Sequence, residues 1–322
     1  MWSRGLRFFV TVAVTVVLFV VSALCRAEER TSPMPTFSTN AQVVNLTVSV
    51  TDATGTHYLE DLGMRDFSVY EDGAPQELDP VLFGKDTLPI SLVMLVDCSD
   101  SMREAFPLAQ RAAVGFMKTL RPQDEARVVA FAKRSQIVQD FADDPALLER
   151  SAASLTVEGN THLYDTLYQQ LRALGSRFPN QERRRVALLL TDGEDIGSLS
   201  SDDDVLEAAR ASGIAVYAIW LPHDAEAPLR REEARKGFWF LQQLATRTGG
   251  TLTSLRAPEA LPEACAAISR ELRTQYHLGY HPRPAERPRT WRTVSVFVKR
   301  NDAVARHRAG YYAPTAPKPL LP

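Results

Sequence analysis

Residues 90–101 read ISLVMLVDCSDS, an apolar run that ends in an aspartate and a short polar loop. The run from residue 90 to residue 96 is uncharged and shows no alternation of polar and apolar side chains, which is typical of a strand buried on both faces. Such strands occur in parallel sheets that helices cover on both sides. Asp97 is the first ionisable side chain after the strand, so we expect it at the carboxyl edge of the sheet, where open α/β sheets bind ligands.

The same pattern of continuous apolar runs recurs along the chain and predicts the fold class. Further apolar runs follow at residues 126–131, 186–190 and 214–220. Segments with helical periodicity lie between these apolar runs and after the last one, at residues 102–120, 162–176, 204–212, 231–246 and 259–273. Alternation of strand and helix predicts an α/β fold, a doubly wound and mostly parallel sheet with right-handed crossovers.

The segments on either side of this pattern are predicted to be β. Residues 44–51 alternate apolar and polar side chains, and residues 66–70, 78–83, 275–280, 293–299 and 303–312 are also predicted strands. Neither flank is large enough to bury a good core alone, so we expect the two to pair as one small β domain into which the α/β domain is inserted. The predicted organisation is a linker at 28–39, an N-terminal β segment at 40–87, the α/β domain at 88–274, a C-terminal β segment at 275–313 and a tail at 314–322.

The first 27 residues differ in composition from the rest. Arg4 and Arg7 precede an uncharged apolar run at residues 8–24, and the small residue Ala27 follows. This is the pattern of a secretory signal peptide cleaved after Ala27, with an uncleaved anchor helix as the alternative, because the run approaches the roughly 17 residues that span a bilayer. We therefore expect an exported protein, periplasmic or extracellular, whose only membrane contact is this segment if it stays attached to the inner membrane.

Composition excludes some classes of function. A formal net charge of -2 provides no basic field for nucleic acid, and we predict no nucleic-acid partner. With Cys25 in the signal segment, only Cys98 and Cys265 remain, too few for a disulfide scaffold. We expect both to be small buried residues.

Five oxygen-bearing side chains form the candidate site. Asp97 and Asp192 each follow a predicted buried strand, Ser99 and Ser101 lie in the loop after Asp97, and Thr161 precedes a predicted helix. Carboxylates and hydroxyls are hard ligands that suit Mg²⁺, Mn²⁺ or Ca²⁺ rather than zinc. The two carboxylates would balance the charge of a divalent ion. A position left open on that ion could then accept an acidic side chain from a partner protein, whose identity the residues do not indicate.

This set resembles the metal-ion-dependent adhesion site of von Willebrand factor A domains, integrin inserted domains included. The resemblance rests on Asp97-x-Ser99-x-Ser101, Thr161 and Asp192-Gly193, and it covers roughly residues 88–275. It implies a non-enzymatic module that binds a protein through a metal. Residues 62–76, LGMRDFSVYEDGAPQ, and residues 310–313, GYYA, are similar to the exported acidobacterial relatives of this family, in which β segments frame the A domain and the partners are largely unknown.

One residue of the loop departs from the family pattern. Asp100 stands where that family usually has glycine. If its carboxylate faces the metal, it would strengthen ion binding and weaken the attraction for an acidic partner. If it faces solvent, it would change little.

Two other functions compete with this interpretation. A Mg²⁺-dependent phosphohydrolase would use Asp97 as its nucleophile, but that chemistry usually needs a second acid two residues later, where Ser99 stands. A structural envelope protein would use the metal only to join the loops, and a covered metal face would favour it. We predict that the protein is not an enzyme.

Overall fold

The computed structural model describes residues 43–85, 88–177, 183–221, 232–255, 257–283 and 290–313. The predicted signal segment, linker and C-terminal tail lie outside these residues. No helix within the described ranges combines the length and the apolar character that a membrane span requires.

A six-stranded sheet forms the centre of the α/β part, residues 88–274, and its strand order is β10-β9-β8-β5-β6-β7. Every neighbouring pair is parallel except β6 and β7. The strands are β5 (Ile90–Asp97), β6 (Glu125–Phe131), β7 (Ser135–Ala142), β8 (Arg184–Thr191), β9 (Ala215–Trp220) and β10 (Leu252–Ser254). The predicted α/β fold class is confirmed.

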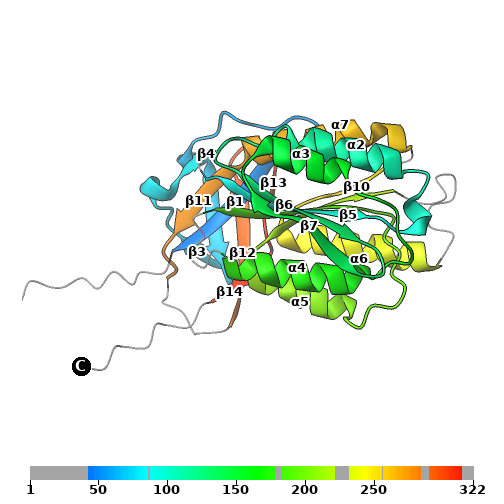
Figure 1. The fold of residues 1–322 in the computed structure, drawn as a ribbon. Coiled ribbons are helices and arrows are strands. Elements are labelled where there is room, and N and C mark those ends of the chain that lie inside the picture. The colour runs from blue at the N-terminus through cyan, green and yellow to red at the C-terminus, as the bar shows by residue number, and fades with distance from the viewer. Residues whose placement is uncertain are drawn as a thin grey trace, which may run out of the picture. The chain divides into compact units, whose positions relative to one another are not determined.

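Helices cover both faces of this sheet (Figure 1). One face carries α2 (Phe106–Met117), α3 (Pro145–Ala153) and α7 (Leu261–Thr274), and the other carries α4 (Leu163–Arg177), α5 (Asp202–Ser212) and α6 (Glu232–Thr248). Alternate side chains of β5 divide between the two layers, since Met94 packs with α2 and α7 while Leu95 packs with α4 and α6. Burial on both faces is the reason that the strand sequences are continuously apolar.

The register of the two central strands sets the position of the candidate site. Val96 of β5 lies opposite Leu190 of β8 in a parallel ladder. Asp97 is the last residue of β5, and Asp192 directly follows β8. Both carboxylates therefore come from the same edge of the sheet.

The flanking segments form two four-stranded sheets, ordered β13-β1-β11-β4 and β14-β12-β2-β3. Their strands are β1 (Val44–Asp52), β2 (Phe67–Glu71), β3 (Ala74–Gln76), β4 (Gly84–Lys85), β11 (Tyr276–Tyr280), β12 (Trp291–Val298), β13 (Ala303–Arg306) and β14 (Gly310–Tyr312). N-terminal β1 pairs with C-terminal β11 and β13, and β2 pairs with β12. Buried side chains from both sheets share one apolar core, and we call these strands the β unit.

Several local predictions differ from the structure. Residues 78–83 were expected to be a strand, but Pro80–Leu82 is a 3-10 turn because the Asp79 carboxylate accepts a hydrogen bond from the Val81 amide, 2.8 Å. The edge strand β7 and helix α3 were not predicted from the sequence. β7 is half-exposed and pairs irregularly with β6, so it lacks the regular alternation that indicates a strand.

A buried carboxylate joins the α/β part to the β unit. Glu271, in the last turn of α7, accepts hydrogen bonds from Ser49 of β1, 2.9 Å, and from Tyr217 of β9, 2.7 Å. The Tyr58 hydroxyl donates to it as well, 2.9 Å, and Arg306 of β13 forms an ion pair with it. This contact ties α7 to both parts of the chain.

Candidate metal centre

The metal loop, residues 97–101, is built around the buried carboxylate of Asp97. Oδ1 of Asp97 accepts a hydrogen bond from the Ser99 amide, 3.0 Å, and Oδ2 accepts one from the Thr191 hydroxyl, 2.6 Å. The Ser99 and Ser101 hydroxyl oxygens lie 3.1 Å apart. The loop therefore brings a carboxylate and two hydroxyls together, and Thr191 of the neighbouring strand orients the carboxylate.

The second carboxylate acts on the first electrostatically. Burial, and after it the negative charge of Asp192, raise the pKa of Asp97 to about 7. Both side chains are almost inaccessible to solvent. Two like charges in such a place destabilise each other, and a cation between them would relieve the repulsion.

Backbone hydrogen bonds hold Thr161 between the two aspartate-bearing loops. The Asp100 amide donates to the Gly159 carbonyl, 2.9 Å, which fastens the metal loop to the segment before Thr161. The Ile196 amide donates to the Thr161 carbonyl, 2.7 Å, which fastens the segment that follows Asp192. Three loops that are remote in sequence thus meet at one edge of the sheet, and Thr161 is buried there.

We call residues 192–200 the aspartate loop, and tight packing positions its start. Oδ1 of Asp192 accepts the Glu194 amide, 3.0 Å, and the carbonyl of Asp192 accepts Nε1 of Trp220, 2.5 Å. Gly193 has φ +81°, a conformation that side-chain-bearing residues rarely adopt. A Cβ on Gly237 of α6 would overlap the Gly193 carbonyl, so this glycine lets the helix approach the loop.

The unusual Asp100 points to solvent. Its side chain is 59% exposed and forms an ion pair with Arg103. Of the two orientations left open by the sequence, the structure shows the one that leaves the centre nearly unchanged.

Sequence reasoning missed three residues next to the candidate donors. Thr191 orients Asp97, Gly237 admits the aspartate loop, and Glu194 is a further buried carboxyl group in that loop. A lone glycine inside a helical pattern was the signal for Gly237. Nothing in the local sequence distinguishes Thr191 from other strand threonines or Glu194 from a surface acid.

The donor set fits a hard divalent cation. Its five groups are two carboxylates and three hydroxyls, all oxygen ligands. Within the described part of the chain, no three His, Cys, Asp or Glu side chains are grouped to hold a metal. Cys98 and Cys265 are buried as expected, and burial raises the pKa of each thiol to about 12.

Three solved structures illustrate what the chain is similar to. A von Willebrand factor type A protein from Catenulispora acidiphila is 15% identical, with 86% of this chain and 76% of that chain covered and a TM-score of 0.47. BatB from Bacteroides thetaiotaomicron is 20% identical, with 57% and 97% covered and a TM-score of 0.43. Proximal thread matrix protein 1 from the mussel byssus, solved with a zinc-occupied MIDAS motif, is 18% identical, with 62% and 49% covered and a TM-score of 0.48.

The match to a protein family is local. No curated protein matches the chain. The family model of the von Willebrand factor type A domain matches residues 92–194, a range that runs from β5 to the aspartate loop and contains all five candidate donors. The chain therefore contains a von Willebrand factor type A domain.

Proposed function

We propose that this is an exported binding protein that holds one divalent metal ion, Mg²⁺ or else Mn²⁺ or Ca²⁺, and uses it to bind an acidic side chain of a partner protein. Domains of this type commonly mediate metal-dependent protein interactions. The observation that carries the proposal is the meeting of two buried carboxylates at the carboxyl edge of neighbouring parallel strands. Export is inferred from residues 1–27, and the proposed membership of the exported acidobacterial group from the two flanking motifs.

Each candidate donor has a role in this proposal. Asp97 and Asp192 supply the negative charge that holds the ion, directly or through water, and Ser99, Ser101 and Thr161 supply neutral oxygens. Because the two carboxylates cancel the charge of the ion, a third carboxylate from a partner can still bind it. These are binding roles, and the proposal assigns no catalytic step.

The surface beside the aspartate loop supports a protein partner. Ile196 is 51% exposed and Leu199 is 97% exposed, although both are large apolar side chains. The loop that carries them is held in place, because the Ile196 amide bonds to Thr161 and the Leu199 amide to the Asp165 carboxylate, 3.0 Å. We infer that the partner presents an acidic residue flanked by apolar ones.

A second candidate function keeps the metal and omits the partner. Asp97, Ser99, Thr161 and Asp192 are each at most 2% exposed, whereas Ser101 is partly exposed. An ion enclosed by such donors would have little open surface and would serve only to join the three loops. This favours the structural alternative, so the metal and the partner are tested separately.

Metal binding is tested by calorimetry on the mature chain with Mg²⁺ and Mn²⁺. One site per chain is expected in the wild type, and no binding is expected in Asp97→Ala. Asp100→Asn is the matched control, because it removes an exposed carboxylate three residues away, and it should bind like the wild type. Equal binding by Asp97→Ala would contradict the metal site.

Partner binding is tested by a pull-down from envelope extract in Mg²⁺ and in EDTA. Partners should be retained only in Mg²⁺. Thr161→Ala keeps both carboxylates and should weaken partner binding more than metal binding. Leu199→Asp should weaken partner binding alone. If the same proteins were retained in EDTA and by both variants, the structural alternative would replace this proposal.

A further inference from the structure

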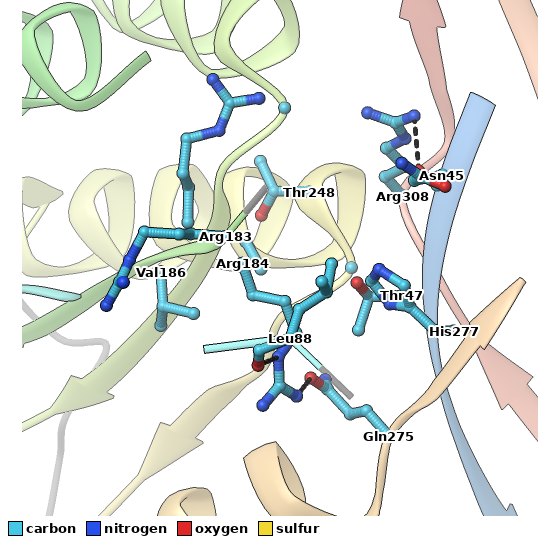
Figure 2. Close-up of a pocket in the computed structure, with 14 residues that line it drawn as sticks. Asn45, Thr47, Leu88, Arg183, Arg184, Val186, Thr248, Gln275, His277 and Arg308 are labelled. Atoms are coloured by element: carbon cyan, nitrogen blue, oxygen red, sulfur yellow. Dashed lines mark hydrogen bonds between the residues drawn. The ribbon is translucent and has the colours of Figure 1, made fainter. Parts of the chain in front are cut away.

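A second candidate site lies at the opposite, amino edge of the central sheet, where the α/β part meets the β unit. We call it the basic cavity. Arg184 and Thr248 line it from the α/β part, and Asn45, His277 and Arg308 line it from the β unit (Figure 2). Among the described residues that line it, none is acidic, and four are arginines.

Two of these arginines are close to each other and have neutral partners. An atom at the Cβ position of Gly213 would lie 3.0 Å from Nη1 of Arg308 and 3.5 Å from Nη2 of Arg185, so the two guanidinium groups are neighbours. Arg185 donates to the Gly175 carbonyl, 2.8 Å, and Arg308 to the Asn45 carbonyl, 3.0 Å. Within the described part of the chain, neither forms an ion pair with a carboxylate.

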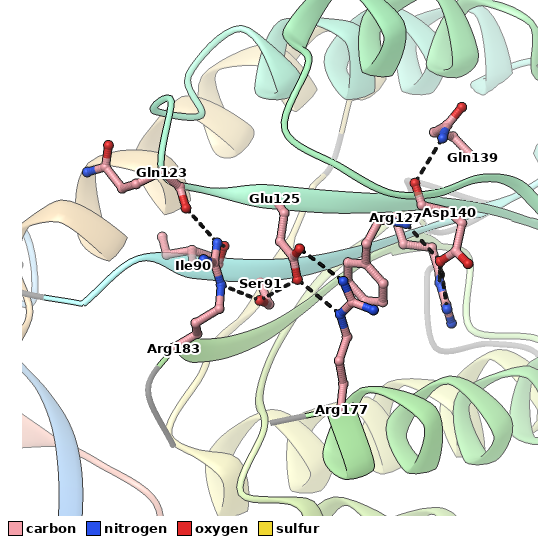
Figure 3. Close-up of polar contacts among 10 residues, drawn as sticks. Ile90, Ser91, Gln123, Glu125, Arg127, Gln139, Asp140, Arg177 and Arg183 are labelled. Atoms are coloured by element: carbon pink, nitrogen blue, oxygen red, sulfur yellow. Dashed lines mark hydrogen bonds and ion pairs between the residues drawn. The ribbon is translucent and has the colours of Figure 1, made fainter. Parts of the chain in front are cut away.

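Two arginines elsewhere in the α/β part are neutralised by carboxylates. Arg177 forms an ion pair with Glu125, 3.1 Å, and Arg127 forms one with Asp140, 2.7 Å (Figure 3). Proteins rarely bury charges without such partners, because removing a charge from water is costly. Arg185 and Arg308 therefore differ from these paired arginines of the same protein as well as from the general rule.

The groups in the cavity experience this excess of positive charge. Burial, and with it the charge of Arg185, lowers the pKa of Arg308 to about 10. Burial, Arg184 and Arg308 lower the pKa of His277 to about 4. Nε of Arg308 and Nε2 of His277 are both inaccessible to solvent and have no hydrogen-bond partner in the described structure.

We propose that the basic cavity binds a tetrahedral oxyanion of the phosphate class, whose oxygens accept hydrogen bonds from Arg185 and Arg308. A dianion would balance these two guanidinium charges, whereas one carboxylate would leave a positive charge uncompensated. Guanidinium groups suit phosphate because each can donate two parallel hydrogen bonds.

The size of the cavity limits the ligand. Its volume is about 60 Å³, several times the roughly 10–15 Å³ that one water molecule needs on the same measure. Several waters or one small ion would fit there. The site thus suits free phosphate or a terminal phosphate group, and it is independent of the metal proposed at the other edge of the sheet.

The test is calorimetry of the mature chain with inorganic phosphate, in chloride buffer of matched ionic strength. EDTA is present throughout, so that phosphate cannot bind through a divalent ion at the metal centre. We expect one phosphate per chain, and an affinity at least about tenfold weaker in Arg185→Gln and in Arg308→Gln, since each loses charge-assisted hydrogen bonds. Arg177→Gln is the matched control and should bind like the wild type, because its partner is Glu125.

Further ligands and melting curves separate the remaining explanations. Sulfate should bind and acetate should bind more weakly, and tighter binding of glycerol phosphate than of free phosphate would assign the site to a terminal phosphate group. Phosphate stabilises many proteins by exclusion from their surface. The informative quantity is therefore how much more phosphate raises the melting temperature of the wild type than that of either variant. A variant that misfolds would melt early in chloride as well. Absence of saturable phosphate binding, or equal binding by both variants, would overturn the proposal.

Discussion

Single residues position the two carboxylates of the candidate site, Asp97 and Asp192. Thr191 donates to Asp97, and its hydroxyl also accepts the Gly193 amide, 2.9 Å. One hydroxyl therefore joins the two loops that carry the carboxylates. Gly237 contributes in a different way, because it is the lack of a side chain that lets α6 reach Gly193.

Replacing Gly237 by alanine should disturb the aspartate loop. The added methyl group would overlap the Gly193 carbonyl, so the loop or the helix must move, at a cost of about 1–3 kcal/mol in the free energy of unfolding. The affinity for Mg²⁺ should also fall, because the aspartate loop carries Asp192. Urea unfolding and Mg²⁺ calorimetry measure the two effects.

Gly115 of α2 offers the matched control for that substitution. It is also a helical glycine, but a Cβ there would meet nothing within 4 Å. Gly115→Ala should therefore stabilise the protein by about 0.5–1 kcal/mol through helix propensity and should leave metal binding unchanged. A similar result for both variants would show that the close approach at Gly237 is unimportant.

Helix α7 has a direct polar connection to the β unit. Its Glu271 carboxylate binds Ser49, Tyr58 and Arg306 on the β side and Tyr217 of the central sheet. The last turn of α7 thus meets β1 and β13 through one buried group. Movement of this helix would have to break these bonds or carry the β unit with it.

Glu271→Gln should lower the stability of the chain markedly. The substitution preserves shape but leaves the partly buried Arg306 without its counter-charge, and removing one partner of a buried ion pair typically costs about 3–5 kcal/mol. Glu232→Gln on α6 is a suitable control, because it breaks an ion pair with Lys236 that is fully exposed, and it should leave stability nearly unchanged. Equal midpoints of urea unfolding for the two variants would contradict the role assigned to Glu271.

For the molecule as a whole, the two ends of the described chain depend on each other. Among the described strands, the sheet neighbours of β1 are the C-terminal strands β11 and β13, and β2 lies between β12 and β3. The division into an inserted α/β domain and one β domain remains a proposal. The described residues, from 43 to 313 with the gaps given above, form one compact unit.

A chain that ends at Arg273 should lose order in its N-terminal β segment. Without β11, β12 and β13, strands β1 and β2 have no long partner, and isolated hairpins are marginal in water. Limited proteolysis or hydrogen exchange should show loss of protection at residues 44–71. If that segment stayed protected, the proposed β domain would be wrong.

Stability should also depend on pH through His277. Its pKa in the folded protein is about 4, below the ordinary value of 6.5 for histidine, so the unfolded chain binds the proton more readily. The stabilisation by the neutral imidazole is complete above pH 6.5 and is lost as the pH falls toward 4, at up to about 1.4 kcal/mol per pH unit.

His277→Asn should flatten this part of the profile. Urea unfolding in chloride buffers between pH 4 and pH 7, compared for wild type and variant, measures the difference. A wild-type slope that the variant reproduces would assign the acid sensitivity to other groups.

Local sequence was sufficient to predict the α/β fold class and to place Asp97 and Asp192 at strand ends. Continuous apolar runs indicate strands that are buried on both faces, and the first charge after such a run marks where burial stops. Side chains within one loop, such as Ser99 and Ser101, follow from the same short stretch. These features depend on neighbours in sequence, which is why they could be predicted.

Other features arise only when distant segments pack together. Gly237 contacts Gly193 across the interface of α6 with the aspartate loop, and Arg185 meets Arg308 although 123 positions separate them in the chain. Such contacts are decided by the register of strands and the packing of whole layers, since each residue type alone is compatible with many neighbours.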